Sequence, residues 1–137
     1  MITFNYETKF NLEDENAIEK WVQRIIKKYC CEVGELNFIF CDDVYLHKIN
    51  IEFLHHDTLT DIISFDNSLG SLISGDIYIS IERVEDNSRD FKVSFQEELQ
   101  RVMIHGILHY LGFKDKTKAD KEEMTAQENE ALLMLNK

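Results

Sequence analysis

Apolar residues recur along the chain with two different periods, and each period predicts one type of secondary structure. Residues 2–7 (ITFNYE) alternate between apolar and polar, which is typical of a strand. Residues 11–33 instead carry an apolar stripe at helical spacing, formed by Ile18, Trp21, Val22, Ile25, Ile26 and Tyr29. Acidic residues at the start of this segment and lysines near its end also favour a helix, which Gly34 is expected to end.

The remaining pattern predicts three further strands and three further helices. The strands are expected at residues 35–42, 60–66 and 76–82, and the helices at 43–55, about 95–111 and about 119–135. Ser94 and Glu97 match a capping box at the start of the penultimate helix. Residues 69–75 are expected to form a turn-rich connection, with Gly75 and Asp76 turning the chain into the last strand. The order of elements predicts an α+β fold in which helices pack on a four-stranded mixed sheet.

Length and composition favour one cytoplasmic domain. The 137 residues contain no internal repeat or linker, so residues 1–137 are expected to form a single domain. No apolar run approaches the roughly 20 residues that a membrane span needs, and the N-terminus lacks the features of a signal peptide. Three cysteines, two of them adjacent, do not resemble a disulfide framework. Reduced cysteines and the absence of a signal sequence are typical of a cytoplasmic protein.

The charge of the chain is strongly negative but unevenly distributed. The formal net charge of −11 argues against nonspecific binding to nucleic acid, which depends on neutralising phosphates. Residues 101–121 nevertheless hold five basic side chains against two aspartates, Asp115 and Asp120. This locally positive segment is either a solvated loop or a surface that meets an anionic substrate.

The segment HGILHYLGFKD, residues 105–115, has the spacing of a metal site. His105 and His109 are four residues apart, so on a helix both imidazoles lie on one face, one turn apart. Gly112 can end the helix in a left-handed conformation and let Asp115 return as a third ligand. Three protein ligands leave a position open for water or substrate, as in catalytic zinc sites. The alternative is a pair of ordinary histidines beside a helix C-cap.

Gly106 indicates which chemistry such a site would perform. Zinc peptidases with a His-Glu-x-x-His helix use that glutamate as the general base, and glycine cannot replace it. A metal without an adjacent carboxylate can still polarise a phosphoryl oxygen. Phosphodiester chemistry is therefore favoured over proteolysis.

Several segments in the correct order resemble one family, the bacterial YbeY endoribonucleases. Residues 105–115 resemble the family signature His-Gly-x-Leu-His-Leu-x-Gly-Tyr-Asp-His. The resemblance extends to four other segments, at residues 49–66 (INIEFLHHDTLTDIISFD), 75–80 (GDIYIS), 97–106 (EELQRVMIHG) and 119–132 (ADKEEMTAQENEAL). It therefore covers most of the chain after about residue 35.

This resemblance implies a zincin-like fold and an activity. It implies one bound Zn²⁺, or a related divalent metal, and a single-strand-specific endoribonuclease that needs no nucleotide cofactor. It also implies a role in ribosomal RNA maturation, notably at the 3′ end of the small-subunit RNA, and in ribosome quality control. The implied partners are ribosomal RNA and the small ribosomal subunit.

Two positions depart from the family pattern. Asp115 stands where the family usually has a third histidine. A carboxylate is also a zinc ligand, although its negative charge should weaken the Lewis acid and favour metals such as manganese. Leu54 stands where the family has an arginine, thought to lie in the active cleft. His56, or His55, and Arg101 are candidates for its contact with substrate. The alternatives are an exposed polar pair at the end of a short helix and, for Arg101, a surface partner of Glu97 or Glu98. No general base is assigned.

Three functions remain open at this point. A metal-dependent endoribonuclease is the first. A non-catalytic, metal-containing ribosome assembly factor is the second, favoured by Leu54 and by the acidic surface. A zincin-like peptidase is the weakest. Asp61 is expected either to form a turn or to line the cleft.

Overall fold

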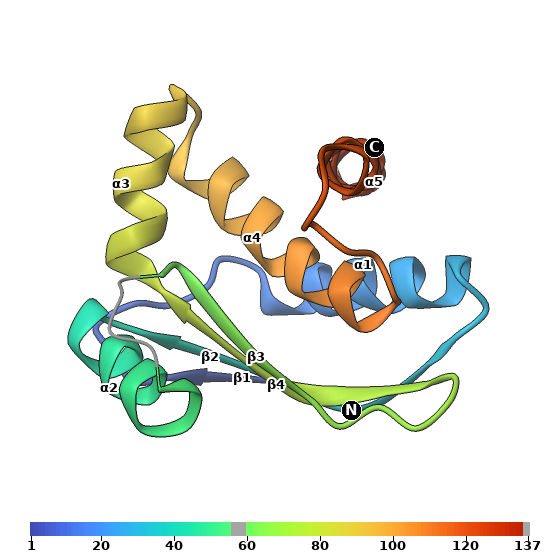
Figure 1. Cartoon of the computed structure of the whole chain (residues 1–137), viewed down its shortest axis with the longest axis horizontal. Helices are drawn as coiled ribbons and strands as arrows, with labels where there is room; N and C mark the ends of the chain where they lie inside the picture. Colours follow the sequence, from blue (N-terminus) through green and yellow to red (C-terminus); the bar gives the residue numbers. More distant parts are fainter. Residues whose placement is uncertain (56–59, 136–137) are drawn as a thin grey trace.

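The computed structural model describes residues 1–55 and 60–135 and forms a mixed sheet covered by helices (Figure 1). The strands are β1 (Ile2–Tyr6), β2 (Glu32–Cys41), β3 (Ile62–Asp66) and β4 (Leu72–Ser80). The helices are α1 (Glu15–Lys28), α2 (Asp43–Leu54), α3 (Ile81–Phe91), α4 (Phe95–Tyr110) and α5 (Lys118–Leu135). The predicted α+β class is confirmed.

The sheet has the order β1-β2-β4-β3, in which only β3 is antiparallel to its neighbour. Because β2 and β4 are central and parallel, both faces of the sheet are covered. Figure 1 shows α1 and α4 on one face with α5 beyond them, and α2 on the opposite face. The four-stranded mixed sheet is thus as predicted.

The larger hydrophobic core lies between the sheet and helices α1, α4 and α5. The apolar stripe of α1 is buried there, and Trp21 has no exposed surface. The Trp21 indole N–H donates to the carbonyl of Ala131 at 2.8 Å, which satisfies the polar atom and ties α1 to α5. A smaller cluster lies under α2 on the other face, formed by Cys41, Leu46, Ile49 and Ile63. The larger core thus holds α4 and α5 on one side of the sheet, and the smaller one holds α2 on the other.

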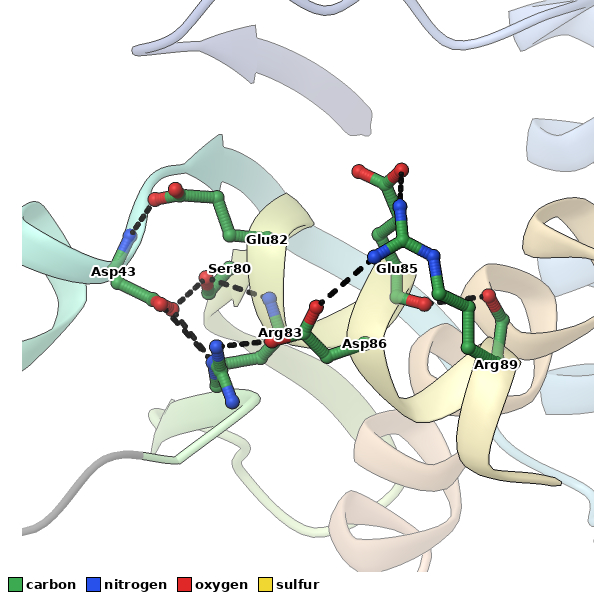
Figure 2. Close-up of polar contacts among 8 residues, drawn as sticks. Asp43, Ser80, Glu82, Arg83, Glu85, Asp86 and Arg89 are labelled. Atoms are coloured by element: carbon green, nitrogen blue, oxygen red, sulfur yellow. Dashed lines mark hydrogen bonds and ion pairs between the residues drawn. The ribbon is translucent and has the colours of Figure 1, made fainter.

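Helix α3 was not predicted from the sequence. The expected strand at 76–82 ends at Ser80, whose hydroxyl accepts from the backbone N–H of Arg83 and caps α3. Its apolar positions, Ile81, Val84 and Phe91, form only a short stripe that Ser88 interrupts, and only Val84 and Ser88 are buried. The Arg83 guanidinium contacts the Asp43 carboxylate at 3.0 Å, and this pair joins α3 to α2 (Figure 2). The pair therefore links α3, which packs mainly against α4, to the helix on the other face of the sheet.

Two glycines were assigned the wrong role. Gly34 does not end α1, because that helix stops at Lys28 and Gly34 lies in β2 at an irregularity of its pairing with β4. Gly75 does not make a turn but lies inside β4 at φ 154°. A Cβ atom at Gly75 would lie 2.3 Å from the carbonyl oxygen of Phe65 and 2.7 Å from the Tyr110 hydroxyl. Close packing, rather than chain reversal, therefore requires glycine at Gly75.

Candidate functional site

The two histidines of the motif lie on one face of α4. Ser94 caps this helix by accepting from the Glu97 N–H at 3.1 Å, as the capping box predicts. Further along the helix, Gly106 faces the sheet, whereas His105 and His109 lie toward the solvent with partly exposed side chains. Their Nε2 atoms are 3.0 Å apart.

The turn after α4 brings Asp115 back to these histidines. Gly112 adopts φ 103°, and its N–H donates to the His109 carbonyl at 3.0 Å. The Phe113 N–H donates to the Leu108 carbonyl at 3.0 Å, which completes a Schellman motif. The Phe113 ring then packs on Tyr29 of the α1 end and anchors the loop. The chain reversal expected at Gly112 is therefore present.

Three ligand atoms converge at this place. An Asp115 carboxylate oxygen lies 3.3 Å from His105 Nε2 and 3.4 Å from His109 Nε2. Three ligands of a tetrahedral zinc at about 2.0–2.1 Å would be roughly 3.3 Å from one another, so the spacing fits such an ion. Among the described residues, this is the only group of three or more potential ligands whose atoms lie within 4.8 Å of one another.

Glu128 of α5 orients the first histidine and was missed in the sequence. Its carboxylate accepts from His105 Nδ1 at 2.7 Å and is itself almost fully buried. This bond directs the unprotonated Nε2 toward the candidate metal position, as outer carboxylates do in metal sites. Burial lowers the pKa of His105, but Glu128, Asp115 and Asp61 outweigh it and raise the pKa overall. The sequence held a signal for Glu128, because it falls on the buried stripe of α5 with Met124 and Ala131.

Comparison with known proteins agrees with this arrangement. The family model described as endoribonuclease YbeY matches residues 2–136. An endoribonuclease YbeY of Flavobacterium johnsoniae is 59% identical over 136 residues, covering 99% of this chain and 98% of the relative. That of Flavobacterium psychrophilum is 56% identical, covering 99% and 97%.

The chain belongs to the YbeY endoribonuclease family. A solved structure supports this at the level of the fold. The solution structure of TM1509 from Thermotoga maritima has a TM-score of 0.65 and 28% identity, and the match covers 96% of this chain and 89% of that one. The resemblance noted in the sequence is thus confirmed.

Arg101 lies beside the candidate metal centre but is already paired. Its guanidinium contacts the Glu128 carboxylate at 2.9 Å and the Asn129 side-chain oxygen at 2.8 Å. The alternative partners considered from sequence, Glu97 and Glu98, are not the ones it contacts. Arg101 and His105 therefore share Glu128, and the expected contact of Arg101 with substrate stays a prediction.

The other residues that the sequence suggests for the site are Leu54, His55, His56 and Asp61. His56 lies outside the described residues. His55 ends α2 in a left-handed conformation and is exposed, and Leu54, at the position of the family arginine, is 39% exposed. Asp61 lines a cleft next to His105, where burial raises its pKa and Asn87 of α3 donates to its carboxylate at 3.3 Å.

Gly106 packs against the sheet and does not face the candidate metal centre. A Cβ atom there would lie 3.0 Å from Ile62 Cδ1 and 3.2 Å from Ile77 Cδ1. A side chain at this position would require Ile62 and Ile77 to shift and would start toward the sheet, so the local packing disfavours the peptidase arrangement. No helix in the described part of the chain is long and apolar enough to cross a membrane.

Proposed function

We propose that this chain, as one domain over residues 1–137, is a metal-dependent endoribonuclease that cuts single-stranded RNA during ribosomal RNA maturation. The observation that carries the proposal is the convergence of His105, His109 and Asp115 at the spacing of a metal ion. The substrate class follows from the family, whose relatives are named endoribonucleases. We further propose the 3′ end of the small-subunit RNA and the small ribosomal subunit as its target and partner.

The chain's own residues would divide the work in the following way. His105, His109 and Asp115 would hold the metal, with Zn²⁺ proposed and manganese as the alternative because one ligand is a carboxylate. When bound, such an ion polarises a phosphoryl oxygen and neutralises developing charge. Glu128 would keep His105 oriented and ready to bind. The side chains of His105, His109 and Asp115 are partly exposed, so the proposed metal position is open to solvent on the side from which a substrate would approach.

Lysines beside the site offer contacts for the RNA backbone. Lys114 and Lys116 flank Asp115 in the chain, and Lys118 begins α5, all three with exposed side chains. In a protein with net charge −11, this local group would provide the phosphate neutralisation that binding requires. Arg101 and His56 are proposed as further substrate contacts.

The test is cleavage of a labelled single-stranded RNA, with metal content measured on the same protein. The purified chain is expected to carry about one metal ion per site and to lose cleavage on chelation. Asp115→Ala should lose both metal and cleavage, whereas Asp90→Ala, an exposed aspartate on α3, should keep both. Metal-free wild-type protein that still cuts RNA would overturn the proposal.

One observation favours a second candidate, a ribosome assembly factor that does not cut RNA. Leu54 occupies the family's arginine position and is partly exposed at the end of α2, where it provides no phosphate contact. That function predicts binding to the small subunit by both wild type and Asp115→Ala, with no cleavage by either. Co-sedimentation together with the cleavage assay separates the two functions.

A further inference from the structure

A cleft of about 340 Å³ adjoins the candidate metal centre and has a mixed lining. His105 belongs to both, so the cleft begins where the metal site ends. Its lining is Asp61, Ile62, Phe91, Glu98, Arg101, Val102, His105 and Glu128. The volume lies at the lower end of the range for small-ligand sites, roughly 300–1,000 Å³. The cleft is therefore large enough for one small planar group.

Glu98 is the unusual member of this lining. Only 4% of its surface is exposed, yet within residues 1–55 and 60–135 its carboxylate has no hydrogen bond or ion pair. No fully buried side-chain oxygen in the described part of the chain lacks a partner, so the carboxylate oxygens of Glu98 border the open cleft and are not sealed in the core. A ligand that displaces water from the cleft must therefore supply hydrogen-bond donors to them. Burial together with the negative charges of Asp61 and Glu128 raises the pKa of Glu98 to about 7. Glu98 therefore lacks a donor that a ligand can supply.

A second metal ion does not fit this place. The carboxylates of Asp61, Glu98 and Glu128 are not among the described ligand atoms that lie within 4.8 Å of one another. Glu128 is also already bonded to Arg101 and His105. The missing partner of Glu98 is thus a neutral N–H donor rather than a cation shared by three acids.

The walls of the cleft favour a flat aromatic ligand. Phe91 at the end of α3 is 65% exposed, and Ile62 and Val102 add apolar surface on the other elements. Unstacked RNA bases bind proteins in this way, with the ring against an aromatic or apolar side chain and the edge hydrogen-bonded. Glu98 and His105 are seven residues apart on α4, or roughly 10 Å along the helix axis, a distance within the reach of one nucleotide.

We propose that this cleft is a nucleobase subsite that selects guanine next to the RNA phosphate at the metal centre. The inference rests on the proposed endoribonuclease function and adds the base preference. Guanine presents two adjacent N–H donors, N1–H and the 2-amino group, which match the two oxygens of the Glu98 carboxylate. Adenine, cytosine and uracil offer no such pair. Ile62, Phe91 and Val102 would enclose the base ring.

Binding of short single-stranded RNAs to the metal-free protein tests the proposal without relying on catalysis. Four oligonucleotides that differ at one central base are compared by fluorescence anisotropy at low salt, together with a fifth that has inosine in place of guanosine. The guanine oligonucleotide should bind roughly tenfold more tightly than the others, because one bidentate base contact gives discrimination of this order. Inosine, which lacks the 2-amino group, should lose most of that preference.

Matched variants identify the residue responsible. Glu98→Gln should bind all five oligonucleotides with similar affinity, and Glu97→Gln, an exposed neighbour in the same helical turn, should keep the guanine preference. Equal binding of all bases by wild type would overturn the guanine subsite, as would a preference that survives in Glu98→Gln. If metal-dependent cleavage were still present in either case, only this inference would fail. Absence of both RNA binding and cleavage would overturn the proposed function as well.

Discussion

The buried carboxyl group of Glu98 should make the stability of the protein depend on pH in a way that one substitution removes. Its pKa is about 7 in the folded chain, against an ordinary value of 4.5. The groups that set this value are, beside burial itself, Asp61 before β3, Arg101 and Glu97 on α4, and Glu128 on α5. Arg101 lowers the pKa and the three acids raise it.

The sign follows from proton binding. Between pH 4.5 and about 7, the unfolded chain has lost the Glu98 proton while the folded chain still holds it. Raising the pH through this interval therefore lowers the free energy of unfolding, and the loss is complete above the folded pKa. At about 1.4 kcal/mol for each unit of pKa, the total loss is roughly 3 kcal/mol. This is an upper value, because the carboxylate borders a cleft that admits water.

Urea unfolding of the metal-free protein across this pH range measures the effect. Glu98→Gln removes the titration, so its stability relative to wild type should rise by roughly 3 kcal/mol between about pH 4.5 and pH 8. Any constant offset from the new amide cancels in that difference. Glu97→Gln should keep most of the wild-type pH dependence, because its side chain is exposed and its charge makes the smallest of the contributions that raise the pKa of Glu98. Parallel curves for wild type and Glu98→Gln would refute the reasoning.

Three other predictions test the metal centre and the strand that supports it. Glu128→Gln should weaken metal affinity by roughly 10–100-fold, measured by competition with a chelating dye, because His105 loses its orienting carboxylate. Asp115→His should retain one metal per chain and shift preference toward zinc over manganese, as a neutral imidazole replaces an anionic oxygen; complete loss of metal by elemental analysis would contradict the ligand assignment. Gly75→Ala should destabilise the fold by roughly 3 kcal/mol through overpacking, whereas Gly70→Ala, whose Cβ meets nothing within 4 Å, should cost only about 1–2 kcal/mol in urea unfolding.

Elements with strong apolar periodicity were predicted correctly from the sequence. The stripe of α1, from Ile18 to Ile26, is buried as expected, and the capping box at Ser94 begins α4. Helix α3 was missed because its apolar stripe, Ile81, Val84 and Phe91, is short and interrupted by Ser88. The alternation of β4 also continues through Ile81 into the helix, so the pattern extends the predicted strand into the start of α3. In the folded chain, α3 packs mainly against α4, and the Arg83–Asp43 pair joins it to α2.

The candidate ligands could be predicted because their spacing is local. His105 and His109 share one helix, and Asp115 follows a single turn, so a stretch of eleven residues contains the whole arrangement. The roles of the surrounding acids depend on tertiary contacts, because Glu128 lies on another helix and is 23 residues from His105 in the sequence. A weaker signal was still present, since Glu98 and Glu128 both occupy positions on buried helical stripes. A charged residue on an apolar stripe is expected to have a specific partner.

The proposed division of charge explains how an acidic protein can act on RNA. Negative groups repel phosphates, yet carboxylates are good acceptors for the N–H groups of base edges. In this chain the exposed lysines Lys114 and Lys116 are neighbours of Asp115 in the sequence, while the acids Asp61 and Glu98 line the adjoining cleft. A single strand could then place its phosphate near the lysines and metal ligands and its base near Glu98. A duplex would keep its bases paired and leave Glu98 without a donor, so the same geometry favours single-stranded RNA.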